Sequence, residues 1–116
     1  MLKEDCLFCK IIKGEIPSTK VYEDDMLLAF KDINPVAPVH VLIIPKTHVE
    51  NTNEIDENNS DYIKHIYEKM GEIAKNAGVF ESGYRLICNC GEDAGQEVKH
   101  LHFHMIGGTK LGLKIV

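Results

Sequence analysis

The stretch at residues 100–108, His-Leu-His-Phe-His-Met-Ile-Gly-Gly, carries the clearest structural pattern in the chain. Successive side chains of a β-strand point to opposite faces, so His100, His102 and His104 are expected on one face and the large apolar residues between them on the other. The pattern predicts a half-buried strand that offers imidazoles to a cleft. Imidazole acts as nucleophile, acid or base near neutral pH, which favours a functional site over a solvated edge strand, although a metal site is also compatible with the pattern.

The bulk composition sets limits on fold and function. A chain of 116 residues with 44% hydrophobic residues fits one compact domain over residues 1–116. The net charge of −5 and the absence of a basic run argue against a nucleic-acid partner. No apolar run is long enough to span a membrane, and the acidic start lacks the apolar core of a signal peptide. We therefore expect a cytoplasmic location, where the four cysteines serve as thiols or ligands.

Hydrophobic periodicity predicts an α+β domain with one mostly antiparallel sheet and helices packed beside it. A longer helix is expected to begin at Ser60 or Asp61, which can cap it, and to end at Gly78. The segment at 111–116 is expected to add an edge strand or a contact to a partner. The remaining predicted elements are a helix at 6–13 and strands at 20–23, 26–31, 40–45, 84–89 and 100–106.

Cys6 and Cys9 are three residues apart and would share one face of a helical turn. With His48 and His100 they would complete the four tetrahedral ligands of a structural zinc site. The spacing alone favours the simpler interpretation, in which both cysteines are buried thiols that pack as small hydrophobes. Both interpretations stay open at this level.

Several further motifs accompany the histidines, and together they resemble the histidine triad (HIT) superfamily, in particular its branch of histidine triad nucleotide-binding proteins. The resemblance covers nearly the whole chain. The matching segments are residues 6–12 (CLFCKII), 14–17 (GEIP), 29–35 (AFKDINP), 37–40 (APVH), 44–48 (IPKTH), 94–96 (AGQ) and 100–106 (HLHFHMI).

The resemblance implies a fold and an activity. The fold is an antiparallel five-stranded sheet with two helices, continued across a homodimer. The activity is hydrolysis of purine nucleoside phosphoramidates through a nucleotidyl-histidine intermediate, with a purine nucleotide as ligand and no organic cofactor. Some relatives cleave dinucleoside polyphosphates, and a purine nucleotide-binding module with little turnover is a further alternative.

The resemblance also assigns roles to the polar residues. His102 matches the nucleophile, and the carbonyl group of His100 matches the acceptor that holds its Nδ1 proton. His40 matches a supporting histidine on the neighbouring strand, and Asp32 matches the residue that binds the ribose hydroxyls. The residues matched to phosphate contacts and the loop beside them are His104, Asn89, Gly95 and Gln96.

Four apolar residues match the purine slot of the family, namely Phe8, Ile11, Phe30 and Ile33. Zinc-containing bacterial members hold the metal at the positions of Cys6, Cys9, His48 and His100. The resemblance thus reverses the preference from spacing and implies one structural zinc ion per chain.

The chain departs from the family at two places. Glu97 stands where many relatives have a serine or threonine that passes a proton to the leaving amine. The C-terminal segment lacks the tryptophan that reaches across the dimer in some relatives. Both departures concern the leaving group rather than the nucleophile.

Overall fold

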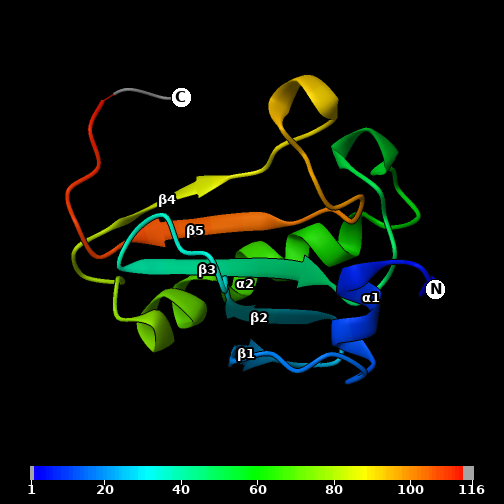
Figure 1. The fold of residues 1–116 in the computed structure, drawn as a ribbon, viewed down its shortest axis with the longest axis horizontal. Helices are drawn as coiled ribbons and strands as arrows, with labels where there is room; N and C mark the ends of the chain where they lie inside the picture. Colours follow the sequence, from blue (N-terminus) through cyan, green and yellow to red (C-terminus); the bar gives the residue numbers. More distant parts are fainter. Residues whose placement is uncertain (1, 114–116) are drawn as a thin grey trace.

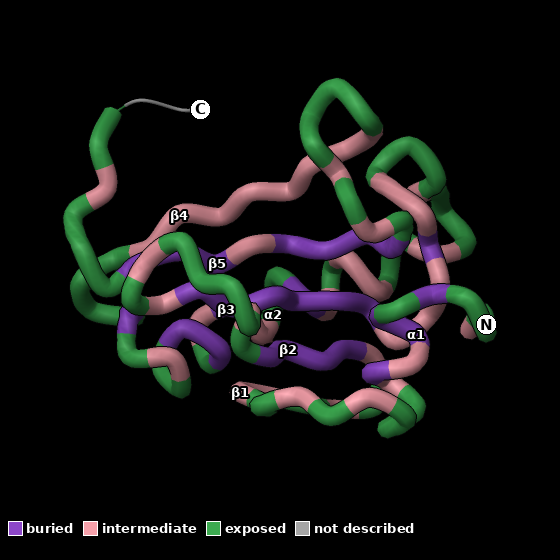
Figure 2. The backbone as a smooth tube through the Cα atoms, viewed as in Figure 1, coloured by how far each residue is buried: buried purple, intermediate pink, exposed green. Residues whose placement is uncertain are grey.

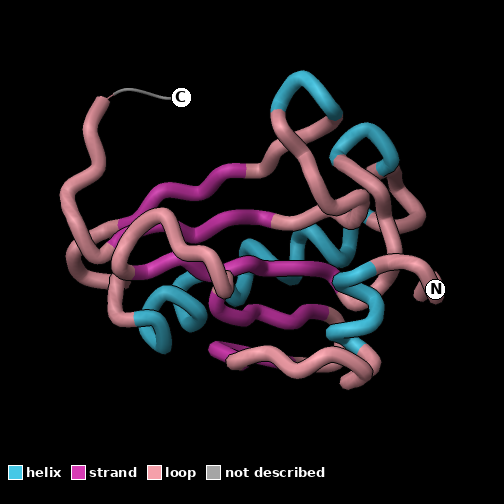
Figure 3. The backbone as a smooth tube through the Cα atoms, viewed as in Figure 1, coloured by secondary structure: helices cyan, strands magenta, loops and turns pink. Residues whose placement is uncertain are grey.

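The structure is a computed structural model that describes residues 2–113, and its centre is one five-stranded antiparallel sheet (Figures 1 and 3). The strands are β1 (Lys20–Glu23), β2 (Leu27–Lys31), β3 (Val39–Pro45), β4 (Tyr84–Ile87) and β5 (Phe103–Gly107). The helices are α1 (Leu7–Ile12) and α2 (Ser60–Ala77), with short 3₁₀ turns η1 (Thr52–Glu54) and η2 (Glu92–Ala94). The strand order across the sheet is β1-β2-β3-β5-β4, so the predicted α+β class and antiparallel sheet with two helices are confirmed.

Helix α2 covers one face of the sheet. Its buried positions are Ile66, Met70, Ile73 and Ala74, which recur at steps of three and four and so form one stripe. The helix ends at Gly78, whose φ of 82° is the left-handed conformation that glycine adopts freely. Ser60 and Asp61 do not cap it. The capping position is Asn59, whose side chain is instead engaged by the preceding turn, where it accepts from the backbone N–H of Asp56.

Helix α1 covers part of the opposite face, at the ends of β2 and β3. It is only six residues long, which is too short for a stable isolated helix, so packing must hold it. The residues of this second core are Cys6, Phe8, Cys9, Ile11, Leu28, Phe30, Leu42 and Ile44. The sheet therefore has an apolar core on both faces, and Figure 2 shows the buried chain concentrated along β2 and β3.

Strand β3 is the centre of the sheet, as its nearly continuous apolar sequence predicted. Its residues from His40 to Pro45 are all buried. It pairs with β2 from Val41 to Pro45 and with β5 from Val39 to Ile43, where the last partners are Ile43 and Phe103. Because β3 pairs with β5 no further than Ile43, strand β5 begins at Phe103. This start is three residues later than the expected start at residue 100.

The other boundaries deviate little from expectation. The strand expected at 84–89 ends at Ile87, and the segment at 111–113 forms no strand, while 114–116 lie outside the described residues. Among residues 2–113, no helix is both long enough and apolar enough to cross a membrane.

Candidate functional site

The histidine segment is placed partly ahead of the strand rather than wholly within it. His100 and His102 precede β5, and only His104 is a strand residue, so the expectation of three histidines on one strand face is wrong for the first two. The physical reason lies in β3, which at its end pairs only with β2. There the carbonyl oxygen of Pro45 accepts a hydrogen bond from the His100 ring Nε2, at 3.0 Å, in place of a strand partner.

The expected alternation of faces nevertheless persists through this segment. Leu101, Phe103 and Met105 pack into the core under α2. The histidine rings lie together on the other side of the sheet, where the ring centroids of His102 and His104 are 5.1 Å apart. The predicted division into an apolar face and an imidazole face is therefore present without a continuous strand.

His102 is buried, with 6% of its surface exposed, and its ring is held by the chain itself. Its Nδ1 lies 2.7 Å from the carbonyl oxygen of His100. A carbonyl oxygen only accepts, so Nδ1 carries the hydrogen and Nε2 keeps a free lone pair. The edge of the Phe8 ring packs against the imidazole, with centroids 5.0 Å apart. Burial lowers the pKa of His102, although the bond to His100 opposes this, so the ring favours the neutral form that a nucleophile needs.

His40 and Asp32 lie beside His104 at the far end of the imidazole row. The Nε2 atom of His40 is 2.8 Å from Nδ1 of His104 and 3.4 Å from a carboxylate oxygen of Asp32. The ligand atoms of these three residues also lie close enough together to hold a metal ion. However, two nitrogen ligands of one tetrahedral ion stay about 3.3 Å apart, so the shorter contact is that of a hydrogen bond.

The loop between β4 and β5 contains Gly95, Gln96 and Glu97, of which Glu97 lines a cavity together with Cys6 and His48, while Asn89 is half-buried just after β4. The side-chain amide of Gln96 donates to the carbonyl groups of Glu50 and Val98, at 2.7 and 3.0 Å, and its oxygen accepts from a backbone N–H of the same loop. Gln96 thus fixes the loop, and Glu97 is exposed.

The four apolar residues expected to form the purine slot separate into two groups. Phe8, Ile11 and Phe30 are buried in the core under α1, with 4–8% of their surfaces exposed. Ile33 is 91% exposed, in the loop that follows β2. Three of the four residues expected in the purine slot therefore pack in one cluster, and Ile33 lies outside it.

The structure brings Cys6, Cys9, His48 and His100 together, with all four ligand atoms within 4.8 Å of one another. The sulfur–nitrogen distances are 3.3 Å from Cys6 to His100, 3.5 Å from Cys9 to His48 and 3.6 Å from Cys9 to His100. In a tetrahedral zinc site such pairs are about 3.5 Å apart. The residues present therefore fit a tetrahedral Cys₂His₂ metal site.

The surroundings of this Cys/His cluster also suit a metal. Because the Nε2 of His100 donates to Pro45, its Nδ1 lone pair faces the two sulfurs, which is the usual way a buried ligand is oriented. Burial lowers the pKa of His100 to about 4, so the ring is neutral and able to ligate. Burial raises the pKa of the Cys9 thiol, a cost that a bound cation offsets by stabilising the thiolate.

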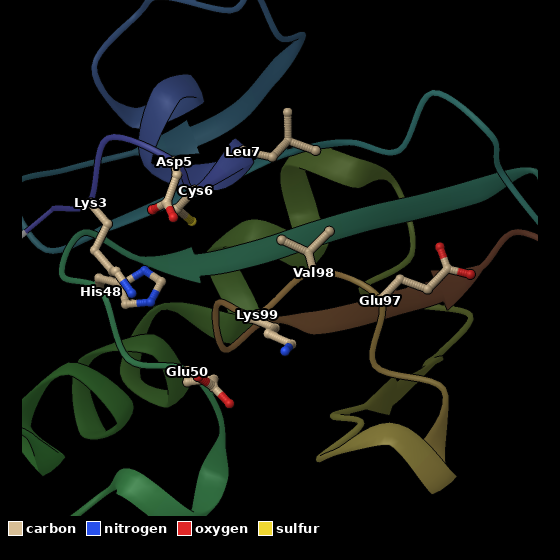
Figure 4. Close-up of a pocket in the computed structure, with 9 residues that line it drawn as sticks. All are labelled: Lys3, Asp5, Cys6, Leu7, His48, Glu50, Glu97, Val98 and Lys99. Atoms are coloured by element: carbon tan, nitrogen blue, oxygen red, sulfur yellow. The ribbon is translucent and has the colours of Figure 1, made fainter.

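A cavity of about 330 Å³ opens beside the Cys/His cluster (Figure 4). Cys6 and His48 line it on one side, and Glu97 lies at the opposite end of the view. Charged residues around it, such as Lys3 and Lys99, were not anticipated, because isolated charges far apart in the sequence give no pattern to recognise. A second cavity of about 220 Å³ reaches Asp32 and His40.

Comparisons with known proteins match nearly the whole chain. The family profile described as scavenger mRNA decapping enzyme C-term binding matches residues 5–114. An uncharacterized HIT-like protein of Rickettsia prowazekii is 47% identical over 112 residues, which cover 96% of this chain and 93% of the relative. The purine nucleoside phosphoramidase of Escherichia coli K12 is 42% identical over 111 residues, with the same two shares covered.

Solved structures match as well. A HIT family hydrolase from Clostridium thermocellum superposes with a TM-score of 0.95 at 54% identity, covering 98% of this chain and 99% of that one. A histidine triad protein from Clostridium difficile gives a TM-score of 0.93 at 52% identity, covering 99% and 100% of the two chains.

Proposed function

The chain belongs to the histidine triad (HIT) family, and from this premise we propose that it is a hydrolase of purine nucleoside phosphoramidates that acts through a nucleotidyl intermediate on His102. The observation that carries the proposal is the 2.7 Å contact between Nδ1 of His102 and the carbonyl oxygen of His100. This contact fixes the tautomer that leaves Nε2 free to attack phosphorus.

The reaction divides into two displacements at the α-phosphorus. In the first, Nε2 of His102 forms a bond to phosphorus, the phosphorus–nitrogen bond of the substrate breaks, and the amine leaves with a proton taken from solvent. In the second, water attacks phosphorus and gives up a proton to solvent, and the bond from phosphorus to Nε2 of His102 breaks, which releases the nucleoside monophosphate and the neutral imidazole. Two displacements with a good leaving group in each replace one difficult step. Many relatives have a serine or threonine hydroxyl at the position of Glu97 to protonate the leaving amine. Because Glu97 is exposed, we assign this proton to solvent instead.

Neighbouring residues would bind the nucleotide. We assign the phosphoryl oxygens to His104 and Asn89, where donors stabilise charge as it develops. Gly95 would shape the loop beside them, because its backbone N–H already donates to the carbonyl group of Glu92 at 2.9 Å. Asp32 is suited to the ribose, because a carboxylate accepts from two hydroxyl groups. Gln96 contributes by holding the loop, since its amide is already engaged with backbone groups.

The base would lie near the apolar residues of α1 and β2. Phe8, Ile11 and Phe30 form the wall of this slot, and the exposed Ile33 would have to close over the base from its loop. The Escherichia coli relative is named for purine nucleosides, which supports a purine in this place.

We further propose that Cys6, Cys9, His48 and His100 hold one structural zinc ion per chain. A bound ion would tie the short helix α1 to the segment that carries His102, and zinc supplies this kind of cross-link in small domains. Its ligands would be thiolates, which a reducing compartment preserves, so we place the protein in the cytoplasm. The four cysteines are all free thiols.

A homodimer is the proposed assembly, with the sheet continued across the interface through β4. Both edge strands expose unpaired backbone groups, and such edges are normally protected. At β1 the ion pairs of Glu23 with Lys20 and Lys46 provide charged protection. Strand β4 carries Tyr, Arg, Leu and Ile, and its one charged residue, Arg85, donates to the carbonyl group of Gly112 and forms no ion pair among the described residues. Sedimentation at a mass of twice 13.1 kDa would support the dimer, and a monomer at micromolar concentration would count against it.

The test of the activity is turnover of an adenosine phosphoramidate by wild type and His102→Asn, with zinc content and thermal stability measured on both. Loss of the nucleophile is expected to lower kcat by roughly 10⁴-fold or more, while His65→Gln, on the far side of the sheet, serves as a histidine control. Full turnover by His102→Asn would refute the mechanism. Tight nucleotide binding without turnover of phosphoramidates or dinucleoside polyphosphates by wild type would instead identify a binding module.

A further inference from the structure

The imidazole of His40 is held from both sides, and one of its partners is a backbone amide. The N–H group of Val36 donates to Nδ1 of His40 at 3.2 Å. A backbone N–H can only donate, so Nδ1 must present its lone pair. His40 is buried, with 7% of its surface exposed, and its single ring hydrogen in the neutral form is therefore on Nε2. A doubly protonated ring would place two donors against each other at this contact.

The tautomer of His104 is fixed in turn by its contact with His40. The Nε2–H group of His40 has two acceptors in reach, Nδ1 of His104 at 2.8 Å and a carboxylate oxygen of Asp32 at 3.4 Å, and the shorter contact defines the hydrogen bond. Nδ1 of His104 is then an acceptor. Burial, and next the neighbouring histidines, lower the pKa of His104 to about 4, so this ring is neutral at physiological pH and its hydrogen is on Nε2.

The adjacent rings of His102 and His104 therefore differ in what they present at Nε2. His102, fixed by a backbone carbonyl, presents a lone pair at Nε2, whereas His104, fixed through His40 by a backbone N–H, presents a hydrogen at Nε2. The ring centroids are 5.1 Å apart, close enough for both to engage one phosphoryl group. A nucleophile needs the first arrangement and an anionic oxygen needs the second.

We propose that the backbone N–H of Val36 is a positioning group of the active site, which fixes His40 and His104 in the tautomers that make His104 a hydrogen-bond donor to the phosphoryl group. The proposal rests on the proposed function for its catalytic consequence, but the tautomers themselves do not depend on it. Val36 is 73% exposed, so this residue contributes through its backbone and not through packing.

The direct test is nuclear magnetic resonance of the ¹⁵N-labelled full chain, because long-range proton–nitrogen spectra distinguish Nδ1–H from Nε2–H histidines. The expected pattern is Nε2–H for His40 and His104 and Nδ1–H for His102. An Nδ1–H tautomer at His40 or at His104 in the wild type would overturn the proposal, whether or not the protein is a phosphoramidase.

A second measurement removes only the N–H group. Replacing Val36 with its α-hydroxy acid counterpart turns the backbone amide into an ester and keeps the side chain. We expect His40 and His104 to become mixtures of tautomers, and kcat for an adenosine phosphoramidate to fall about fivefold to tenfold with KM changed less than twofold. Val36→Pro also removes the N–H, whereas Val36→Ala retains it and is expected to retain both tautomers.

The two proposals fail in different ways. Unchanged tautomers in the ester protein would refute the role of Val36 and leave the phosphoramidase proposal intact. The expected shift of tautomers in a protein that binds nucleotide but turns over no phosphoramidate would refute the phosphoramidase proposal and leave the role of Val36 intact. A merely structural role would lower the melting temperature without moving the tautomers.

Discussion

Replacement of Asp24 by asparagine should destabilise the fold measurably, because this carboxylate joins the turn between β1 and β2 to helix α2. One of its oxygens accepts from the backbone N–H groups of Met26 and Leu27, at 2.8 and 3.0 Å. The other accepts from the hydroxyl of Tyr22 at 2.8 Å and from Nε2 of His65 at 2.6 Å. Asparagine can keep the first pair but presents an NH₂ group to the second.

The magnitude follows from the two bonds lost. A hydrogen bond to a charged group contributes about 1.5–3 kcal/mol, so two would contribute roughly 3–6 kcal/mol if fully buried. The side chains of His65 and Asp24 are 22% and 24% exposed, so water and rotation of the Tyr22 hydroxyl recover part of this. We expect a loss of about 2–3 kcal/mol, equivalent to a decrease in Tm of roughly 8–12 °C for a chain of this size.

The pH dependence provides a second test of the same residue. Burial by itself raises the pKa of Asp24, but the hydrogen bonds from His65, Met26, Tyr22 and Leu27 outweigh burial and hold this pKa well below its ordinary value of 3.8. A depressed pKa means that the stabilisation is present above the unfolded pKa and is lost as pH falls through the folded one. The difference in stability between wild type and Asp24→Asn should therefore be constant from pH 7 to about pH 5 and shrink below pH 4.

The assay is urea unfolding of proteins with equal zinc content across this pH range. The matched control is Asp25→Asn, which changes an exposed carboxylate in the same turn and is expected to cost less than about 0.5 kcal/mol. A loss below 0.5 kcal/mol for Asp24→Asn, or an equal loss for Asp25→Asn, would show that the hydrogen bonds do not support the fold in the way described.

Three further outcomes are expected. Cys9→Ser should lose the zinc ion measured by elemental analysis and unfold at a lower temperature, whereas Cys90→Ser should keep one ion per chain; equal zinc in both would rule out the site. Gly107→Ala should cost about 1–3 kcal/mol in urea unfolding, because its Cβ would lie 3.0 Å from a valine methyl and 3.1 Å from a backbone oxygen. Gly71→Ala, in helix α2 with only a 3.4 Å contact, should be neutral or stabilising, and the reverse order would contradict the packing described. Phe8→Ala should cost about 3–5 kcal/mol, since the ring is buried against three aromatic neighbours, and a loss below 1 kcal/mol would contradict its place in the core.

Much of the fold follows from local patterns in the sequence. The apolar run that became β3 and the three- and four-residue steps of α2 predicted elements whose burial the structure confirms, because each depends on the period of one segment alone. The start of β5 could not be predicted in this way. It depends on how far β3 offers a partner, which is a property of two segments 60 residues apart.

In the candidate site, too, some features could be predicted from single segments of the sequence and others could not. The pattern of histidines located the triad, whereas the spacing of Cys6 and Cys9 alone favoured buried thiols, and only the family resemblance favoured a zinc site at the Cys/His cluster. The contacts that fix the rings involve backbone groups of Val36, Pro45 and His100. The resemblance implied the His100 carbonyl as the acceptor for His102, and the structure has that contact. Nothing pointed to the backbone groups of Val36 or Pro45, because a backbone group leaves no mark in the sequence. Gln96 was expected beside the phosphate, yet its side chain bonds to backbone groups of Gly91, Val98 and the distant Glu50, an outcome that depends on how the loop folds against the chain that follows β3.

The most direct test of the account is to identify the atom that carries the nucleotide during turnover. Wild-type protein would be mixed with an adenosine phosphoramidate, quenched under denaturing alkaline conditions within one turnover, digested and sequenced by mass spectrometry. The account predicts an adenylyl group on His102 that appears and disappears at the rate of catalysis. No adduct, or an adduct on another histidine, in a preparation that turns over at its full rate would contradict it.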